Sequence, residues 1–281
     1  MSIDETLTWA KLTLVNSESA LLDAQVLLAF VLEKETIYLM TWPERELSTA
    51  QKNAFEGLIK QRADGVPVAH LTGVREFWSL PLKVNNSTLI PRPDSEMLVE
   101  SALDYCAANG RILDLGTGSG AIILALASEL PNAYCLGVDV NERAVALAIE
   151  NGRDLKLNNV HFKHSNWFDN VDGLFDVIVS NPPYIEKGNR HLLLGDVRFE
   201  PLSALVAEEN GLADIRKIAQ QTPGYLKKGG YLLVEHGFEQ GSAVREILTD
   251  LGYSKVITIK DYGDNDRVTM GLFNQPDSLL K

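Results

Sequence analysis

Apolar residues in the first 73 positions follow a distribution that is typical of helices, and no clear strand interrupts it. Residues 20–32 are densely apolar. Ser48, with Gln51 three residues later, forms a capping-box pattern that predicts the start of a third helix. Residues 65–67, Gly-Val-Pro, predict its end. We therefore expect a small helical bundle that ends at residue 73.

The pattern changes to short apolar runs after this bundle. Residues 77–84 and 88–90 read as strands, and they flank Asn85-Asn86-Ser87, so that the segment predicts a β-hairpin. Pro91-Arg92-Pro93 then predicts the start of a helix that runs to about Asn109.

From Arg111 onward, predicted strands alternate with predicted helices. The expected strands are 111–115, 134–140, 160–164, 175–180, 230–235, 255–260 and 267–273. The expected helices begin at Gly120, Glu142, Gly211 and Gln240. This alternation predicts an α/β fold with a Rossmann-like, doubly wound sheet, to which a C-terminal hairpin adds one antiparallel strand. The predicted division is a helical domain over 1–73, a hairpin linker over 74–93 and an α/β domain over 94–281.

Composition and charge narrow the function classes. The 281 residues are 45% hydrophobic and 23% charged, as in ordinary globular proteins. No apolar run reaches the length of a membrane span and the N-terminus lacks a signal pattern, so we expect a cytoplasmic protein. Cys106 and Cys135 lie in segments that read as core, which disfavours a disulfide framework. The net charge of −12, without a basic run, favours a protein partner over a polynucleotide.

A glycine-rich loop, Asp114-Leu115-Gly116-Thr117-Gly118-Ser119-Gly120, joins the first of these strands to its helix. Such loops bring the backbone close to a nucleotide-like ligand, but Gly116, Gly118 and Ala121 also fit the dinucleotide fingerprint. Asp139 ends the next strand, where a carboxylate either holds ribose hydroxyls or caps the following helix. Trp167 follows the third strand and either lines an adenine pocket or belongs to the core.

The most informative motif is Asn181-Pro182-Pro183-Tyr184, directly after the strand at 175–180. The prolines stiffen the backbone and leave carbonyl oxygens without neighbouring N–H donors. An amide side chain and an aromatic face lie beside them. The set suits a planar substrate with an NH2 group, although Asn-Pro-Pro alone could also be a tight turn at a strand end.

The glycine loop, the acidic residue ending the second strand and the Asn-Pro-Pro-Tyr motif together resemble the class I S-adenosylmethionine-dependent methyltransferases that act on planar nitrogens. Residues 89–96, Leu-Ile-Pro-Arg-Pro-Asp-Ser-Glu, and 195–205, Gly-Asp-Val-Arg-Phe-Glu-Pro-Leu-Ser-Ala-Leu, look like the peptide chain release factor glutamine methyltransferases, the PrmC or HemK family. In the sister family that methylates a ribosomal protein, Cys usually replaces Gly116 and the proline motif lacks Pro93. The resemblance covers nearly the whole chain.

The resemblance implies methylation of the glutamine amide nitrogen in the Gly-Gly-Gln loop of class 1 release factors. It implies S-adenosylmethionine as cofactor and S-adenosylhomocysteine as product, with Gly116, Thr117, Gly118, Ser119, Gly120, Asp139, Trp167 and Asn181 as cofactor-binding residues. Substrate contacts fall on Asn181, Pro182, Pro183 and Tyr184. Our hypothesis is that the Asn181 side-chain oxygen and the Pro182 carbonyl accept the amide hydrogens while Tyr184 stacks on the amide plane. The helical domain would dock the release factor, and we expect a monomer.

Several alternatives stay open at this point. The same motif could methylate a ribosomal-protein glutamine or adenine N6 of a nucleic acid, which would require a flipped base. A non-catalytic adaptor and a nicotinamide dehydrogenase are less consistent with the Asn-Pro-Pro-Tyr motif. The five histidines are scattered without ligand spacing, so we expect no metal. The sequence leaves the roles of Arg92, Glu96, Glu200 and His236 undecided.

Overall fold

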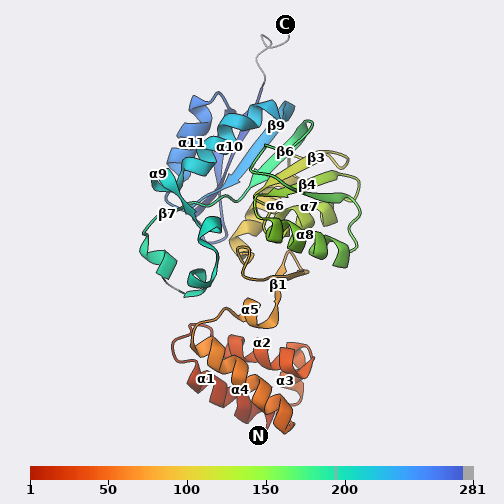
Figure 1. The fold of residues 1–281 in the computed structure, drawn as a ribbon, viewed down its shortest axis with the longest axis vertical. Helices are drawn as coiled ribbons and strands as arrows, with labels where there is room; N and C mark the ends of the chain where they lie inside the picture. Colours follow the sequence, from red (N-terminus) through yellow and green to blue (C-terminus); the bar gives the residue numbers. More distant parts are fainter. Residues whose placement is uncertain (194, 275–281) are drawn as a thin grey trace. The chain divides into compact units, whose positions relative to one another are not determined.

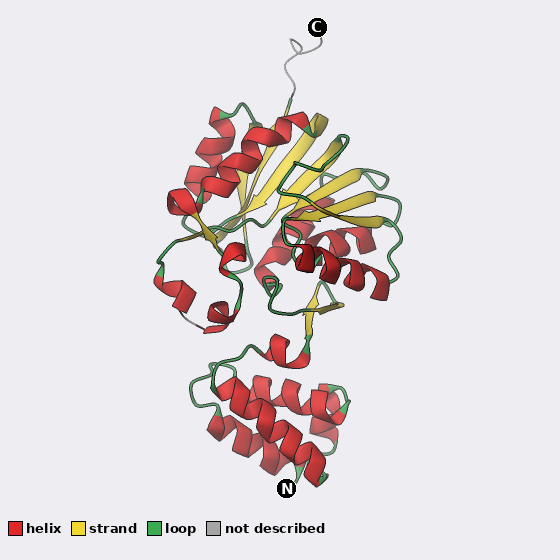
Figure 2. Cartoon of the chain, in the orientation of Figure 1, coloured by secondary structure: helices red, strands yellow, loops and turns green. Residues whose placement is uncertain are grey.

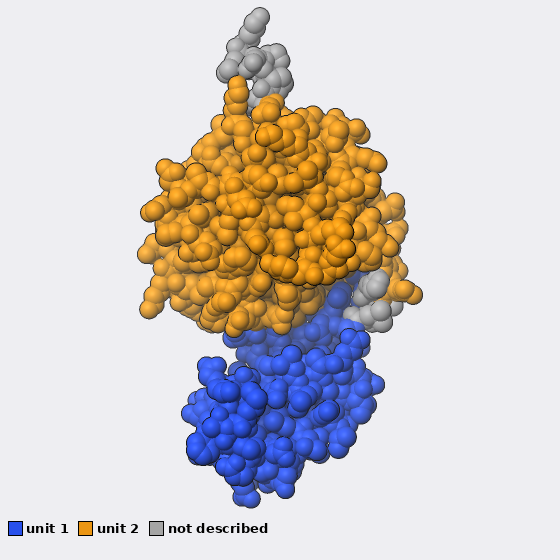
Figure 3. Space-filling model, turned by 180° about the vertical axis from the view of Figure 1, so that it is seen from behind, with its two compact units in different colours: residues 1–74, 191–199 blue, residues 75–190, 200–281 orange. Residues whose placement is uncertain are grey.

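A computed structural model describes residues 1–193 and 195–274 of the chain. The chain forms two compact units, shown in different colours in Figure 3. The helical unit comprises residues 1–74 together with 191–199, and the sheet unit comprises 75–190 and the residues from 200 onward. Residues 275–281, the end of the predicted α/β domain, lie outside the described residues.

The helical unit is a bundle of short helices (Figure 1). Its helices are α1 (Ile3–Thr13), α2 (Ala20–Leu32), α3 (Thr36–Thr41), α4 (Thr49–Ala63) and α5 (Val68–Thr72). Ser48 caps α4 through the predicted capping box with Gln51, which confirms the predicted start. The prediction that this helix is the third one was wrong, because the short α3 precedes it. Leu27, Leu28 and Phe55 are fully buried in the core of the bundle.

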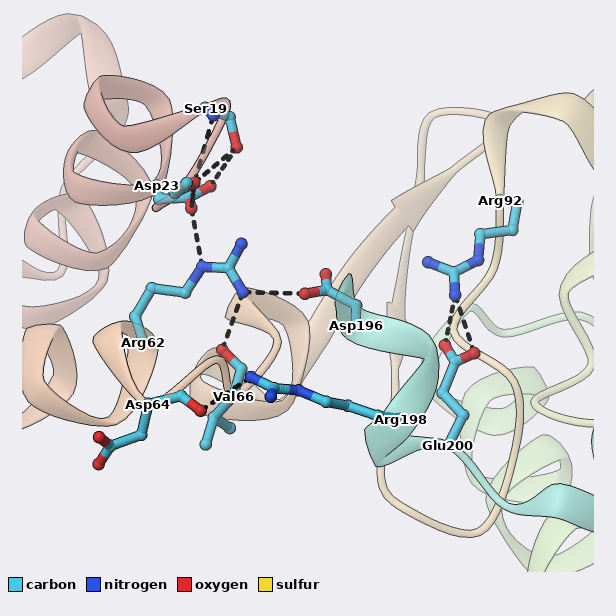
Figure 4. A network of polar contacts seen from close by, with 10 residues as sticks. Ser19, Asp23, Arg62, Asp64, Val66, Arg92, Asp196, Arg198 and Glu200 are labelled. Atoms are coloured by element: carbon cyan, nitrogen blue, oxygen red, sulfur yellow. Dashed lines mark hydrogen bonds and ion pairs between the residues drawn. The ribbon is translucent and has the colours of Figure 1, made fainter. Parts of the chain in front are cut away.

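A network of ion pairs holds the second segment of the helical unit against its helices (Figure 4). Arg62, in α4, donates to Asp23 Oδ2 over 2.8 Å and to Asp196 Oδ1 over 2.9 Å. Arg198 donates to the carbonyl oxygen of Asp64 over 2.9 Å. The sequence division at residue 73 did not predict that a segment so far along the chain belongs with the helices.

The predicted hairpin exists, but the sequence placed it wrongly. It pairs β1 (Val74–Phe77) with β2 (Leu80–Lys83), and its turn consists of Trp78 and Ser79, both in the left-handed region at φ 53° and 59°. The Trp78 backbone N–H donates to Glu96 over 2.8 Å, a tertiary contact that holds the turn where no glycine marks it.

The sheet unit is built on a seven-stranded sheet (Figure 2). In spatial order its strands are β10 (Ser254–Lys260), β11 (Asp266–Phe273), β9 (Leu226–Glu235), β6 (Phe175–Ser180), β3 (Arg111–Leu115), β4 (Tyr134–Asp139) and β5 (Val160–His164). β11 is antiparallel to both of its neighbours, and the pairs formed by β9, β6, β3, β4 and β5 are parallel. The doubly wound sheet with one antiparallel strand is therefore confirmed.

Helices cover both faces of this sheet (Figure 1). On one face lie α6 (Glu96–Leu103), α7 (Ala121–Glu129) and α8 (Glu142–Asp154), and on the other lie α10 (Ala213–Gln221) and α11 (Gly241–Asp250). The predicted helix from 91 to 109 is shorter than expected. It begins with a 3-10 turn at Pro93–Ser95 and α6 ends at Leu103, because a turn closed by Gly110 N–H to the Ala107 carbonyl then leads the chain into β3.

A minor pair of strands follows the Asn-Pro-Pro-Tyr motif. β7 (Ile185–Glu186) pairs in parallel with β8 (Val206–Ala207), which leads through α9 (Glu208–Gly211) to α10. Short 3-10 turns at Arg190–Leu193, Gly195–Phe199, Leu202–Ala204 and Thr222–Gly224 complete the described elements. Within the described ranges, none of the helices is both long and apolar enough to cross a bilayer.

Candidate active site

The candidate site lies at the carboxyl ends of the central strands. The strand order reverses between β3 and β6, and in doubly wound sheets ligands bind in the crevice that such a reversal opens. A pocket of about 310 Å³ occupies this place. The predicted residues that line it are Gly116, Thr117, Gly118, Ser119, Asp139, Trp167, Asn181 and Pro183.

The glycine loop turns tightly over the end of β3. Gly116 has φ +74°, a backbone conformation that favours glycine, and a Cβ there would be in van der Waals contact with the Trp167 ring at 3.4 Å. Gly120 does not line the pocket. It is the N-cap of α7, and a Cβ there would come within 2.9 Å of Leu124 and 3.2 Å of Ala148. The third glycine therefore serves helix packing.

The Asp139 carboxylate, at the end of β4, stabilises the glycine loop by accepting a backbone hydrogen bond. Its Oδ2 accepts from the Gly118 N–H over 2.9 Å and its Oδ1 from the Asn141 N–H over 2.8 Å. Asn141 is the N-cap of α8, so the alternative reading of Asp139 as the cap of that helix was wrong. Burial raises the pKa of Asp139.

Asp114 lies deeper, at the end of β3, and is fully buried. Thr117 donates its hydroxyl to Asp114 Oδ2 over 2.6 Å. Desolvation raises the pKa of Asp114 to about 7, with Thr117 lowering it and the Asp139 charge adding to the rise. Asp114 therefore stabilises the glycine loop through its hydrogen bond with Thr117.

The Asn-Pro-Pro-Tyr motif continues β6 directly into the site. Asn181 Nδ2 donates to the Ser95 hydroxyl over 3.1 Å, and both residues line the pocket. Pro183 lines it as well, whereas Pro182 and Tyr184 do not. Gln240 donates to the Tyr184 carbonyl over 3.1 Å, and burial together with the Glu235 charge raises the pKa of Tyr184.

An ion pair fixes the chain that precedes the helix start at Pro93. Arg92 Nη2 donates to both carboxylate oxygens of Glu200 over 2.8 Å (Figure 4). Glu200 Oε1 also accepts from the Ile90 N–H over 3.1 Å. The Glu200 side chain is fully buried. This pair joins the two segments on which the family resemblance rested, and it orders the wall of the pocket at Leu89 and Pro91.

His236 has a structural role. Its Nδ1 donates to the Gly237 carbonyl over 2.9 Å, so that Nε2 accepts from the Thr269 hydroxyl over 2.7 Å. It is fully buried, and desolvation lowers its pKa. Across residues 1–193 and 195–274, no cluster of His, Cys, Asp and Glu could hold a metal ion.

Comparison with known proteins assigns the family. The PrmC N-terminal domain family matches residues 5–73, and a methyltransferase domain family matches residues 107–255. The release factor glutamine methyltransferase of Shewanella oneidensis is 54% identical over 272 residues, 96% of this chain and 95% of the relative. That of Vibrio cholerae is 56% identical over 260 residues, 92% of this chain and 91% of the relative. The chain belongs to the release factor glutamine methyltransferase family.

A solved structure supports the fold independently. The crystal structure of a methyltransferase from Pyrococcus furiosus has a TM-score of 0.54 at 22% identity, over 69% of this chain and 89% of that one. The predicted family, enzyme class and class I methyltransferase fold are therefore confirmed.

The pocket of this family member fits the cofactor that a methyltransferase domain implies, S-adenosylmethionine. Its wall combines backbone exposed by glycines, the Asp139 carboxylate and the Trp167 ring. Thr88 adds a polar atom that the sequence did not point to. Its hydroxyl is buried without a hydrogen-bond partner in the described part of the chain, and the residue lines the pocket beside Gly118. An unpaired buried hydroxyl facing a pocket is satisfied when a polar ligand enters.

Sequence reasoning also missed Ser95, Asp214 and Glu235. Ser95 and Asp214 line the pocket, and burial raises the pKa of Asp214. Glu235 ends β9 and is 1% exposed. Ser95 was part of the proline segment that carried the resemblance, and Glu235 was a visible acid at the end of an apolar strand. The position of Glu235 at a strand end could have indicated a site residue, because ligands bind at the carboxyl ends of the strands in such sheets.

Proposed function

We propose that the chain transfers a methyl group from S-adenosylmethionine to the side-chain amide nitrogen N5 of the glutamine in the Gly-Gly-Gln loop of class 1 peptide chain release factors. The observation that carries this proposal is the position of Asn181. It continues β6 into the same pocket that the glycine loop lines, so that an amide-recognition group and a cofactor loop face one cavity. Membership of the release factor glutamine methyltransferase family selects the substrate class.

In this proposal the substrate amide is held by two acceptors. An amide nitrogen is a weak nucleophile because its lone pair is delocalised into the carbonyl, and the bound cofactor supplies an electrophilic methyl sulfonium. The Asn181 Oδ1 and the Pro182 carbonyl accept the two amide hydrogens and orient the nitrogen. An N–CH3 bond would form as the S–CH3 bond breaks, S-adenosylhomocysteine would be the leaving group, and one amide proton would pass to solvent. Tyr184 stacks on the amide plane. Positioning of this kind supplies about 7–11 kcal/mol in favourable intramolecular models.

The cofactor contacts follow from the pocket lining. The backbone of Gly116 to Ser119 approaches the cofactor, Asp139 accepts from the ribose hydroxyls, and Trp167 lies against the adenine. Asp139 retains acceptor capacity for this task, since each of its oxygens uses one of two lone pairs on a backbone N–H. No metal takes part in the proposed reaction.

The proposed partners are class 1 release factors, which the helical domain docks as the protein substrate. Among the described residues this unit exposes large apolar side chains, including Leu22, Ile37, Met40 and Trp42, which suit a protein surface better than a polynucleotide. The proposal places a monomeric enzyme in the cytoplasm.

The test is methyl transfer from labelled S-adenosylmethionine to a purified class 1 release factor, its Gln→Ala loop variant and duplex DNA. Label on the wild-type factor only supports the proposal. Label on DNA, or on a ribosomal protein in a parallel reaction, contradicts the substrate assignment. Asn181→Ala is expected to keep affinity for S-adenosylhomocysteine and to lose most turnover, and normal turnover in that variant contradicts the acceptor role.

A further inference from the structure

A buried carboxyl group lies directly behind the amide-recognition motif. In the parallel pairing of β6 with β9, Ser180 is level with Val234, so the residues that follow each of them, Asn181 and Glu235, end neighbouring strands at the same edge. Glu235 is 1% exposed, and its Oε2 has no hydrogen-bond partner among the residues that the structure describes. The proposed acceptor role uses Asn181 and leaves this carboxyl unexplained.

Ser95 connects the two groups. Asn181 Nδ2 donates to Ser95 Oγ over 3.1 Å, so the serine hydroxyl has its own proton left to donate. Hydrogen bonding from Ser95 and from Asn181 favours the ionised form of Glu235 against the opposing effect of burial. Both side chains therefore lie close enough to Glu235 to stabilise its charged form.

Charged groups from every neighbouring element act on Glu235. Burial, the largest effect, raises its pKa to about 7; the Arg267 charge on β11 lowers it and the Asp94 charge on the 3-10 turn raises it. The Arg267 guanidinium is itself held by Asp261 at 2.8 Å and by Asp94 at 3.3 Å. Tyr184 follows β6, and after burial the Glu235 charge is the next cause that raises the pKa of its hydroxyl.

We propose that Glu235 is a positioning residue for the substrate amide: through Ser95 and by direct attraction it holds the Asn181 side chain with its NH2 group inward, so that Oδ1 faces the pocket. The inference rests on the proposed function, because it concerns how the amide acceptor is oriented.

The orientation of Asn181 matters because a carboxamide has a hydrogen-bond acceptor, its oxygen, on one side and a donor, its NH2 group, on the other. With Nδ2 directed at Ser95 and Glu235, Asn181 presents an acceptor to the two hydrogens of a substrate amide. Rotated by half a turn, it would place its oxygen against the carboxylate and its NH2 against the substrate NH2, which brings like groups together on both sides. An ionised Glu235 disfavours the rotated form. A protonated Glu235 can donate to that oxygen and so permits it.

A pH dependence follows. Protonation of Glu235 weakens its hold on Asn181, so turnover is expected to rise with pH through about 7 and then to level off. The Glu235→Gln variant is expected to lack this rise in turnover, because glutamine does not titrate. Its side chain can also present either its oxygen or its NH2 group to Ser95. In that variant we expect kcat about ten- to hundred-fold lower, with KM for the release factor and the affinity for S-adenosylhomocysteine changed less than about two-fold.

The experiment is steady-state methyl transfer to a class 1 release factor between about pH 5.5 and pH 8.5, the range that brackets the expected transition. The variants are Glu235→Gln, Glu235→Asp and Ser95→Ala, and Glu239→Gln is the matched control at an exposed position on the same connection. Glu235→Asp keeps the charge and is expected to keep the pH step with part of the rate. Ser95→Ala is expected to lower kcat without removing that step.

A substrate-free readout accompanies the kinetics. The Asn181 side-chain NH2 signals in an NMR titration of the S-adenosylhomocysteine complex are expected to shift with pH near 7 in wild type and not in Glu235→Gln. An active wild type with an unchanged pH profile in Glu235→Gln overturns the inference. Loss of S-adenosylhomocysteine binding in both Glu235→Gln and Glu235→Asp also overturns it, because the role is then structural. A wild type that labels no release factor refutes the proposed function instead, while the NMR titration still decides the orientation of Asn181.

Discussion

Arg62→Met removes a guanidinium that pairs with two carboxylates of the helical unit while keeping most of the apolar stem. The Arg62 and Asp23 side chains are only 13% and 9% exposed, so their ion pair lies largely in the interior. Removing one partner of a buried pair costs about 3–5 kcal/mol, because the other charge stays behind. The hydroxyls of Ser17 and Ser19 still donate to Asp23 over 2.8 and 2.9 Å. We therefore expect the lower end, a loss of about 3 kcal/mol in unfolding free energy.

Asp196→Asn is the matched control on the other arm of the same guanidinium. The Asp196 side chain is 34% exposed, and partly solvated pairs contribute about 0–1 kcal/mol. The two substitutions thus break ion pairs of similar length, 2.8 and 2.9 Å, with very different expected consequences.

Native-state hydrogen exchange is the suitable assay, because two compact units can unfold separately and a single melting temperature then has no clear meaning. Amides of α2 and α4 report the local free energy of unfolding. The double variant Asp23→Asn with Arg62→Met is expected to lose less than the sum of the single losses. If the amides of α2 and α4 are as well protected from exchange in Arg62→Met as in Asp196→Asn, burial does not determine the strength of the Arg62–Asp23 pair and the reasoning is refuted.

Three further predictions concern the sheet unit. Folding raises the pKa of Glu235 from 4.5 to about 7, so the folded state binds the proton more tightly and wild-type stability falls as pH rises between these values. At about 1.4 kcal/mol per pKa unit, the free energy of unfolding of Glu235→Gln is expected to exceed that of wild type by about 3 kcal/mol at pH 8 and to equal it at pH 4. A difference between variant and wild type that is the same at both pH values in denaturant titrations would contradict this. Gly211→Ala is expected to lose about 2 kcal/mol or more and to lower turnover, because Gly211 has φ +84° and a Cβ there would overlap the Tyr184 carbonyl. Gly188→Ala is the control, with φ +85° and nothing within 4 Å, so equal losses in thermal unfolding would show that only backbone strain matters. Thr88→Val is expected to weaken S-adenosylhomocysteine binding about ten-fold in calorimetry, because the buried hydroxyl lines the pocket without a described partner and a bound cofactor is expected to supply one; unchanged affinity would remove Thr88 from the site.

The strands of the sheet unit and their alternation with helices could be predicted from the sequence, because their signals are local. β3, β5 and β6 begin and end at the predicted residues. β3 and β6 are mainly apolar, whereas β5 alternates apolar with polar residues, and turn-forming residues flank all three strands. The glycine loop and the Asn-Pro-Pro-Tyr motif each lie within one connection, so their residues needed no tertiary information to be recognised. Doubly wound topology then placed both motifs at the same edge of the sheet.

The hairpin shows where local signals fail. The chain does turn at Asn85-Asn86-Ser87, where the Ser87 N–H donates to Asn85 Oδ1 over 2.8 Å, but the hairpin itself closes earlier, at Trp78 and Ser79. Glu96 of α6 and Glu129 of α7 accept from the backbone and the indole N–H of Trp78 over 2.8 and 2.7 Å, so these contacts depend on residues far along the chain. The turn propensity was therefore correct for 85–87, and tertiary hydrogen bonds mark the turn that closes the hairpin.

The amino-acid order alone was enough for the family and the fold class, because the motifs and apolar runs that indicate them each lie within a short stretch of chain. Packing alone brought Ser95 and Glu235 behind Asn181 across 86 and 54 positions of sequence, and joined Arg62 to Asp196 across 134. The pKa of a buried carboxyl and the direction in which an amide points depend on the groups that surround them in space. No periodicity along a chain records such surroundings, and so they appear only once the strands have been assembled into a sheet.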